Sequence, residues 1–418
     1  MSAAIEQAVD EVLAKEIEPG GPGAAVAILK KGRFIIRKAY GLADLEWNTP
    51  LLPDAVFRIA SLTKQFTAVA VMMLAERGLV SIDEPIERYL ADWPSRDRRI
   101  TVRHLLNHTS GVWRHDSELV ERTLRPNPPV EEVLKLIFAK PFEFAPGERY
   151  SYNNSGYLLL GAIIGAVSGR TYEAFLREEI FEPLGMTRTG ILRHEVVTPL
   201  RARGYVRGRK RFHNARLDAM NWSHAAGALG STLDDLARWD QAIRTHRLVS
   251  AQTLEVMLAD TPLADGSRFP YGFGWGTANY RGDRVYHHTG GISGFACQML
   301  HFRDEDLTTI VLSNLYLFPF DKVTRAMMRA AKGFSQPAAT RPTPEQLAAC
   351  TGRFEGEWPL VIADIDADLG ALGERTLCNR SDPEVEYRFS ELREGRFQRL
   401  DYASPLWPVS TLRRVGAN

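Results

Sequence analysis

The pattern of apolar and polar positions divides the chain into strand-like ends and a helical middle. Residues 5–17 have the helical spacing of an amphipathic segment, and residues 19–41 predict two strands joined at a turn of Lys31 and Gly32. From about Ser61 to Leu258 the pattern is mostly helical and is broken by Gly and Pro. Three strand-like runs and one helical run come next: RVYHHTG, FACQMLHFRD, LTTIVLSN and FDKVTRAMMRAAKGF.

This order of elements predicts an α+β fold with more than one domain. Strands at both ends of a segment with helices between them favour one antiparallel sheet that is built from the two ends. The segment SQPAATRPTPEQ is rich in Pro, Thr and Ala without periodicity, which predicts a linker over residues 335–344. Short strand-like runs (TGRFEG, LVIADID, EYRFSEL) then alternate with Gly and charged turns, which is typical of a small antiparallel barrel or sandwich. We therefore expect a main domain over residues 1–334 and a small β domain over residues 345–418.

Composition and charge restrict the classes of partner. The 418 residues are 44% apolar and 25% charged, which are ordinary values for a globular protein. The formal net charge of +1 gives no reason to expect a nucleic acid or an anionic membrane as partner. The acidic, amphipathic N-terminal pattern argues against a secretory signal, and no apolar run approaches the roughly 20 residues of a membrane span. An odd number of cysteines without a signal then favours reduced thiols, so we expect a cytoplasmic protein.

One segment carries reactive side chains where the pattern predicts burial. Residues 57–78 are apolar on almost every side, which is typical of a buried helix, yet Ser61 and Lys64 stand near its start. Residues three apart share one face of a helix, and the helix N-terminus favours an oxyanion over an ammonium. Desolvation also drives the lysine toward its neutral form, which can serve as a general base for a serine nucleophile. The ordinary alternative is that Ser61 caps the helix and Lys64 extends to water.

Two further stretches carry side chains suited to the same chemistry. PGERYSYNNSGYLLLG places Tyr152 and Asn154 at the start of an apolar helix, and VYHHTGGISGF places His288, Gly290 and Gly291 at the end of a strand. Glycines let a substrate lie against a strand edge, and a bare backbone N–H can stabilise an oxyanion. Taken separately, capping and core packing would explain the first stretch, and a hairpin turn with an exposed histidine would explain the second.

Together the motifs S-x-x-K, Y-x-N and H-T-G, in this order, resemble the penicillin-recognising serine hydrolases. That family includes class C β-lactamases, D-alanyl-D-alanine carboxypeptidases, D-aminopeptidases and related esterases. The segments LLNHTSGV, FEPLGMTRTG, GALGSTLDDLARW and YGFGWG extend the resemblance over about residues 24–332. It implies a β-lactamase/penicillin-binding-protein-like antiparallel sheet flanked by helices, a helical subdomain, and a small C-terminal β-barrel-like domain.

The resemblance implies a catalytic role for three residues. Ser61 would be the acylated nucleophile, and Lys64 would be its base or the group that keeps Tyr152 ionised. Tyr152 would relay protons to the leaving group and then activate the deacylating water. Which of Lys64 and Tyr152 takes the first proton stays open, because two coupled groups titrate as a pair.

The resemblance also implies substrate-binding and oxyanion-hole roles for five residues. Asn154 would bind a substrate amide or carbonyl, and His288 and Gly290 would line the opposite wall. The backbone N–H groups of Ser61 and Gly291 would form the oxyanion hole.

Two departures from the best-known members bear on the substrate. β-Lactamases and carboxypeptidases usually have lysine at the position of His288, and a histidine is only partly charged near neutral pH, so the anchor for a substrate carboxylate is weakened. H-x-G is instead the pattern of D-aminopeptidases and some esterases of the family. Those D-aminopeptidases carry two C-terminal barrels, whereas this chain has room for one, so a strict preference for D-amino-acid amides does not follow.

The sequence therefore predicts a serine hydrolase that cleaves a small amide or ester through an acyl-enzyme. D-aminopeptidase or D-amino-acid amidase activity is the first hypothesis, and a carboxylesterase on the same site is the second. A non-hydrolytic, receptor-like homologue is the alternative of another class, although a pure binder has no need of the full proton-transfer set. We expect a small amide, peptide or ester as partner, no cofactor, no metal, no nucleic acid and no membrane, and we leave a homo-oligomer open.

Three remaining features have ordinary explanations. His104 and His108 have the spacing of helical zinc ligands but lack the HExxH glutamate and a third ligand. The basic run RARGYVRGRKRFHNAR is expected to be a solvated hairpin, and the alternative is a loop that overhangs the pocket and attracts an acidic substrate. Trp113 and Trp222 could form a wall of an apolar pocket or pack elsewhere.

Overall fold

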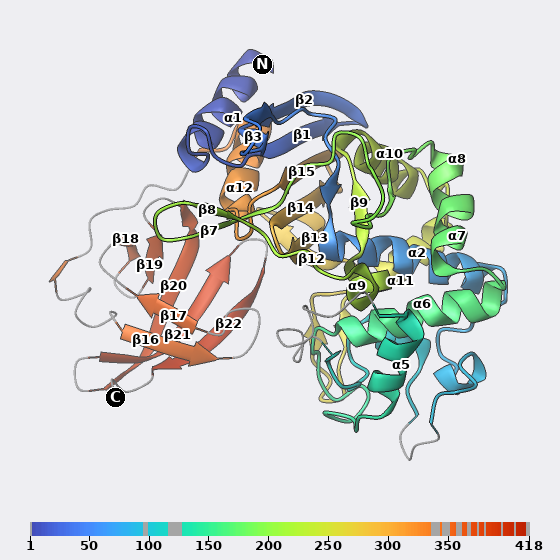
Figure 1. The fold of residues 1–418 in the computed structure, drawn as a ribbon. Helices are drawn as coiled ribbons and strands as arrows, with labels where there is room; N and C mark the ends of the chain where they lie inside the picture. The colour runs from blue at the N-terminus through green and yellow to red at the C-terminus, as the bar shows by residue number, and fades with distance from the viewer. Residues whose placement is uncertain are drawn as a thin grey trace. The chain divides into compact units, whose positions relative to one another are not determined.

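A computed structural model describes residues 2–94, 99–115, 128–335 and 343–344, and strand segments between residues 352 and 414 (Figure 1). Its contacts divide the chain into two compact units, Met1–Thr277 with Tyr286–Met327, and Ala278–Val285 with Met328–Asn418. The predicted linker over residues 335–344 lies largely outside the described residues, so the predicted domain boundaries stay predictions.

The main sheet joins strands from the two ends of the first 335 residues, as expected. In the described part its order is β12-β13-β14-β15-β1-β2. The pairs β1–β2, β1–β15 and β14–β15 are antiparallel. Their register places Ala24 opposite Ser313 and Lys30 opposite Leu307. The strands are β1 (Ala24–Lys30), β2 (Arg33–Tyr40), β12 (Gly276–Tyr280), β13 (Asp283–Ile292), β14 (Phe295–Phe302) and β15 (Leu307–Ser313).

Helices cover both faces of this sheet. On β2, the Arg37 guanidinium donates to Asp234 of α10 (Leu233–Arg244) at 2.9 and 2.5 Å, and the neighbouring Lys38 donates to Asp10 of α1 (Ser2–Glu16) at 2.6 Å. Successive strand residues point to opposite faces, so α10 and α1 lie on opposite sides. Double coverage explains why β1 and β15 are buried along nearly their whole length, and why β1 is apolar from Ala24 to Leu29.

The helical middle packs around α2 (Thr63–Glu76), which is buried from its first residue to Leu74, as its apolar pattern predicts. Gly78, at φ +72°, follows its end in the left-handed conformation that a helix C-terminus favours. The other helices are α3 (Val102–Leu106), α5 (Val130–Phe138), α6 (Asn154–Ser168), α7 (Tyr172–Leu176), α8 (Glu182–Leu184), α9 (Met220–Gly227), α11 (Ala251–Met257), α12 (Phe320–Lys332), the 3-10 turns η1 (Ala60–Leu62) and η2 (Ile86–Arg88) and the π-helix η4 (Arg177–Phe181).

Short strands complete the larger unit. β5 (Phe57–Arg58), β9 (Leu229–Ser231) and β6 (Gly190–Ile191) form a small antiparallel sheet just before the helix that carries Lys64. The basic run forms the expected hairpin of β7 (Tyr205–Arg207) and β8 (Phe212–Asn214). The remaining pairs are β3 (Leu42–Asp44) with β4 (Thr49–Pro50) and β10 (Thr261–Pro262) with β11 (Arg268–Phe269).

The C-terminal region forms a separate antiparallel sheet, which confirms the prediction of a small β domain. Within its described segments the order is β17-β16-β22-β21-β20-β19-β18, so β17 and β18 are the end strands of the described pairings. The strands are β16 (Gly352–Gly356), β17 (Ile362–Ile365), β18 (Leu369–Gly373), β19 (Thr376–Asn379), β20 (Asp382–Arg393), β21 (Arg396–Ser404) and β22 (Trp407–Arg414). The α+β class expected from the sequence is therefore confirmed.

Asn314 joins three segments of the larger unit and generates a stability prediction. Its side chain is fully buried, accepts from the Gly23 N–H at 2.7 Å, and donates to the carbonyl oxygens of Leu42 at 3.0 Å and Arg203 at 2.9 Å. Asn314→Ala should lower the free energy of unfolding by about 2–4 kcal/mol, because it leaves buried backbone groups without partners. Urea denaturation measures the change.

The matched control is Asn214→Ala, because Asn214 is exposed and donates only to Glu46 among the bonds recorded. It should change the free energy of unfolding by less than about 0.5 kcal/mol. Equal losses in the two variants would contradict the role assigned to Asn314.

Candidate active site

Ser61 lies in the 3-10 turn η1, directly before α2. The residue before it, Ala60, has a φ of +44°, in the left-handed region that non-glycine residues seldom adopt. Gly290 of β13 packs against this turn so closely that an added Cβ would lie 2.4 Å from the Ile59 oxygen. The Cys297 thiol donates to the same oxygen at 3.0 Å. The main sheet therefore holds the strained turn that presents Ser61, and Gly290 is needed there for lack of space.

Lys64 is fully buried one turn further along the helix. Its Nζ lies 3.2 Å from Ser61 Oγ, 2.7 Å from Asn154 Oδ1 and 2.8 Å from the Ala226 carbonyl oxygen. In the neutral amine, the two N–H groups can satisfy the amide and carbonyl oxygens, which accept only. The lone pair then faces Ser61 Oγ and can accept the hydroxyl proton. This geometry suits a general base beside a nucleophile.

Tyr152 and Asn154 reach the same place from the start of α6. The Asn153 side chain caps this helix by accepting from the Gly156 N–H at 3.1 Å, which fixes the residues on either side of it. The Tyr152 ring centroid lies 4.7 Å from Lys64 Nζ. The structure therefore brings together the side chains of the S-x-x-K and Y-x-N motifs, which the sequence places about 90 residues apart.

His288 is buried behind this group and both of its ring nitrogens are engaged. The Asn153 N–H donates to His108 Nδ1 at 3.0 Å, so the neutral His108 ring carries its proton on Nε2, which lies 3.3 Å from the Tyr271 oxygen. The Tyr271 hydroxyl then donates to His288 Nε2 at 2.9 Å, and His288 Nδ1–H donates to the Thr289 oxygen at 2.6 Å. The backbone donor at one end thus sets the direction of the whole chain of hydrogen bonds.

This network is neutral at neutral pH. Burial, reinforced by the nearby Lys64, lowers the pKa of His288 to about 3. Burial also lowers the pKa of His108 well below its ordinary value and raises the pKa of Tyr271 well above its ordinary value. The expectation that His288 is partly charged near neutral pH is therefore wrong, because it took no account of burial.

A cavity of about 450 Å³ opens over Ser61. Ser61, Asn154 and Gly291 line it, together with Trp222 and the carboxylate-bearing Asp218. The two residues predicted for the oxyanion hole thus face one space. Lys64, Tyr152, His288 and Gly290 are not among its lining residues, and their predicted roles stay predictions.

Three other residues near the site were not assigned a role there from the sequence. His115 lines the cavity, and it is fixed by Ser155, whose Oγ lies 2.8 Å from Nδ1, and by the Trp222 carbonyl oxygen, which lies 2.9 Å from Nε2. His108 and Tyr271 join the buried network described above. Both lie within the family-like segments LLNHTSGV and YGFGWG, and the spacing of His108 from His104 pointed only to a metal site.

Neither a metal site nor a membrane span is found in the described part of the chain. Among the described residues no three His, Cys, Asp or Glu side chains are grouped so that they could hold a metal ion. His104 instead accepts from the Thr101 N–H at 3.2 Å in a capping box, and His108 belongs to the buried network. No helix built from described residues combines the length and the apolar character needed to cross a bilayer.

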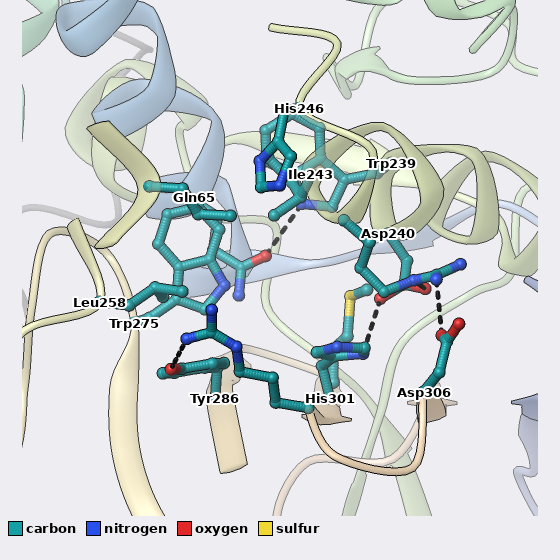
Figure 2. A pocket seen from close by; sticks show the side chains of 14 residues that line it. Gln65, Trp239, Asp240, Ile243, His246, Leu258, Trp275, Tyr286, His301 and Asp306 are labelled. Atoms are coloured by element: carbon teal, nitrogen blue, oxygen red, sulfur yellow. Dashed lines mark hydrogen bonds and ion pairs between the residues drawn. The ribbon is translucent and has the colours of Figure 1, made fainter. Parts of the chain in front are cut away.

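A second cavity, of about 240 Å³, lies against the residue that follows Lys64 (Figure 2). Its wall contains the Trp239 indole, which donates to Gln65 Oε1 at 3.1 Å, and the Arg244 guanidinium, which donates to Asp240 at 2.9 Å. Neither Ser61 nor Lys64 lines it. We interpret this cavity as part of the packing that supports α2, because the polar side chains in its wall are hydrogen-bonded to each other.

The comparisons with known proteins agree with this geometry. The Beta-lactamase family model matches residues 2–332. Penicillin-binding protein 4* of Bacillus subtilis is 30% identical over 310 residues, covering 68% of this chain and 66% of the relative. A D-aminopeptidase of Brucella anthropi is 31% identical over 359 residues, covering 85% of this chain and 68% of the relative. The chain thus spans about two thirds of the length of these curated relatives.

Two solved structures share the fold. The octameric penicillin-binding protein homologue from Pyrococcus abyssi superposes with a TM-score of 0.71 at 24% identity, over 98% of this chain and 99% of that one. The D-amino acid amidase from Ochrobactrum anthropi SV3, complexed with L-phenylalanine amide, gives a TM-score of 0.69 at 27% identity, over 79% of this chain and 98% of that one.

The buried histidines generate a prediction for the stability of the protein in acid. Burial lowers the pKa of His224 and of His287 to about 4, and that of His288 to about 3, from an ordinary value of 6.5. The unfolded chain therefore binds more protons between pH 6.5 and about 4, and the free energy of unfolding should fall as the pH falls through this window. The expected slope is about 1.4 kcal/mol per pH unit for each histidine, measured by urea unfolding at several pH values.

His287→Gln should reduce this slope by one histidine's share. The matched control His213→Gln, at an exposed position, should leave the slope as it is. A free energy of unfolding that stays constant from neutral pH to pH 4.5 would contradict burial of neutral imidazoles.

Proposed function

The chain belongs to the beta-lactamase family of serine hydrolases, and we propose that it acts through an acyl-enzyme on Ser61 to release an N-terminal D-amino acid from an amide or a short peptide. The observation that supports the catalytic assignment is the position of the buried Lys64 Nζ, 3.2 Å from Ser61 Oγ. The cytoplasmic location and any homo-oligomer stay predictions.

In the proposed acylation step, Ser61 Oγ bonds to the substrate carbonyl carbon while its proton passes to the Lys64 lone pair. The carbonyl π electrons move to the oxygen, and the backbone N–H groups of Ser61 and Gly291 are proposed to stabilise the resulting oxyanion. Asn154 serves two purposes in this proposal. Its side-chain oxygen holds Lys64 at 2.7 Å, and the residue lines the cavity in which the substrate carbonyl would lie.

After the attack of Ser61, the leaving amine must receive a proton, and the acyl-enzyme must then be hydrolysed. We propose that Tyr152, whose ring lies beside Lys64, delivers it as the carbon–nitrogen bond breaks and then takes a proton from the incoming water. The water oxygen bonds to the acyl carbon, and Ser61 Oγ leaves with a proton returned through Lys64. The neutral network of His108, Tyr271 and His288 would orient Tyr152 without adding charge.

Three observations support an amino-acid amide as the substrate class. The matched relatives include D-aminopeptidases, and a D-amino acid amidase shares the fold at 27% identity. His288 is neutral and hydrogen-bonded on both nitrogens, so it offers no fixed positive charge for a terminal carboxylate. Asp218 lines the cavity and provides a carboxylate that a free substrate amine can pair with.

A substrate panel tests the proposed activity. D-alanine p-nitroanilide should be hydrolysed at least about tenfold faster than its L-enantiomer, because one enantiomer alone can place its amine at Asp218 and its carbonyl at the oxyanion donors together. The panel also contains a short-chain p-nitrophenyl ester and a chromogenic cephalosporin. Ser61→Ala should abolish turnover and the acyl adduct that mass spectrometry detects.

The other outcomes separate the alternatives. Turnover of the ester alone would identify a carboxylesterase. No turnover of any compound, together with no adduct on Ser61, would leave the receptor-like homologue.

Replacement of Lys64 tests the mechanism. In the wild type, the rate should rise from acidic toward neutral pH as the general base loses its proton. Lys64→Met should lower kcat/KM by about 10²–10⁴-fold and remove this rise. The matched control is Lys30→Met, the same substitution at a lysine that pairs with Glu305 at 3.0 Å, and it should leave the rate and its pH profile unchanged. An unchanged pH profile in Lys64→Met would remove Lys64 from the chemistry.

A further inference from the structure

A third cavity, of about 300 Å³, adjoins the cavity over Ser61 and is lined by arginines. The two cavities share the lining residues Arg216 and Ser293. The third cavity is also lined by Arg58, Arg201 and Arg203, and its lining contains no aspartate or glutamate. Positive charge is thus collected next to the proposed site of acylation.

Arg58 is the strongest element of this cluster. Its side chain lies on β5, three residues before Ser61, and only 3% of it is exposed. Within the described part of the chain, its Nε has no hydrogen-bond partner and its guanidinium forms no ion pair. Burial, with Arg201 nearby, lowers the pKa of Arg58 to about 10. The Asp218 carboxylate partly opposes this lowering, but it forms no ion pair with Arg58 and accepts from the Ser293 N–H at 3.2 Å.

His194 cannot satisfy the guanidinium groups that approach it. His194 Nε2 donates to the Asp218 backbone oxygen at 2.9 Å, so Nδ1 is the acceptor nitrogen of the ring. Arg58 Nη2 lies 2.8 Å from the donor Nε2 and 3.4 Å from Nδ1, and Arg201 Nη2 lies 3.3 Å from Nδ1. Burial and the two arginines lower the pKa of His194, so its ring is neutral and has a single acceptor nitrogen. At least one guanidinium N–H that faces the imidazole is therefore left without an acceptor there.

Other arginines of the same unit do have carboxylate partners. Arg193 pairs with Glu173 at 2.6 Å, Arg203 pairs with Glu46 at 2.5 Å, and Arg207 pairs with Glu18. Arg58 and Arg201 differ because, among the described residues, neither has an ion pair and both face a cavity. A buried cation without a counterion is costly, and a bound anion would remove that cost.

We propose that this cavity is a subsite for a carboxylate group of the substrate, bound by Arg58 and Arg201. The inference rests on the proposed function and specifies its substrate class: amides or peptides in which an acidic side chain lies next to the scissile bond. Guanidinium groups bind carboxylates through paired, charge-assisted hydrogen bonds. Part of the basic run around the hairpin would then act on the substrate, whereas its outer residues are solvated.

Two isosteric pairs of substrates test the proposal. D-glutamic acid α-p-nitroanilide is compared with D-glutamine α-p-nitroanilide, and D-alanyl-D-glutamate is compared with D-alanyl-D-glutamine. The acidic member should have a kcat/KM at least about tenfold higher in one of the pairs, the size of effect typical of hydrogen bonds to a charged group. In Arg201→Gln that ratio should fall toward one, and Arg201→Lys should keep part of it.

The matched control is Arg207→Gln, which removes the same charge from the same basic run. Arg207 pairs with Glu18 and does not line the cavity, so the ratio should stay at its wild-type value. A ratio near one in both pairs, with the neutral members turned over, would overturn the subsite while leaving the proposed function intact. The same fall in both variants would reduce the effect to general charge and would also overturn it.

If no compound is turned over, that result counts against the proposed function, and a binding measurement then tests the subsite by itself. Glutarate should raise the thermal unfolding midpoint of the wild type, whereas neutral glutaramide should not, because a ligand that binds only the folded state stabilises it. Arg201→Gln should lose the glutarate effect. No rise with glutarate in the wild type would overturn the subsite.

Discussion

The burial of the Lys64 amine is the constraint on which the arrangement of the site depends. An amine without access to water needs polar partners at fixed positions, and here they are Ser61 Oγ, Asn154 Oδ1 and the Ala226 oxygen. These atoms belong to η1, α6 and α9; α9 contacts both η1 and α6, and all three elements contact α2. The helical middle of the chain must therefore be packed before Lys64 can be buried, so Ser61 and Lys64 come into position only in the folded unit.

The surroundings of Lys64 keep positive charge away from it. His108 and His288 both lie close enough for Lys64 to lower their pKa values, in addition to the larger effect of burial. The same repulsion acts in the other direction, so a charged imidazole at either position would oppose the protonated form of the lysine. Both rings are neutral and linked through Tyr271, so in the proposed mechanism they would orient Tyr152, and Lys64 and Tyr152 would carry the proton transfers.

Local patterns predicted what depends on local geometry. The hairpin at Lys31, the sheet built from the two ends of the first 335 residues, and the shared helix face of Ser61 and Lys64 all follow from the order and periodicity of apolar and polar residues. The contact of Lys64 with Asn154 does not, and it was expected only from the resemblance to a family. The burial of His288 could not be predicted, because it depends on Tyr271 and on a histidine from another part of the helical region. An isolated Arg58 in a short strand gives no signal either, since its lack of a counterion is a property of the tertiary structure.

The position of Arg58, three residues before Ser61, relates substrate binding to catalysis. The strand β5 pairs with β9, and the strained turn follows it at once, so one short segment carries both a buried cation and the nucleophile. A neutral substrate would leave the Arg58 guanidinium without a counterion, whereas a substrate that bears a carboxylate would form an ion pair with it. A site with an unpaired buried charge rejects a neutral substrate, because that substrate brings no counterion. Such a site discriminates between substrates more strongly than an apolar pocket can. In the free protein the buried guanidinium of Arg58 is unfavourable because it has no counterion. Binding of an acidic substrate would relieve this unfavourable free energy, and binding of a neutral one would not.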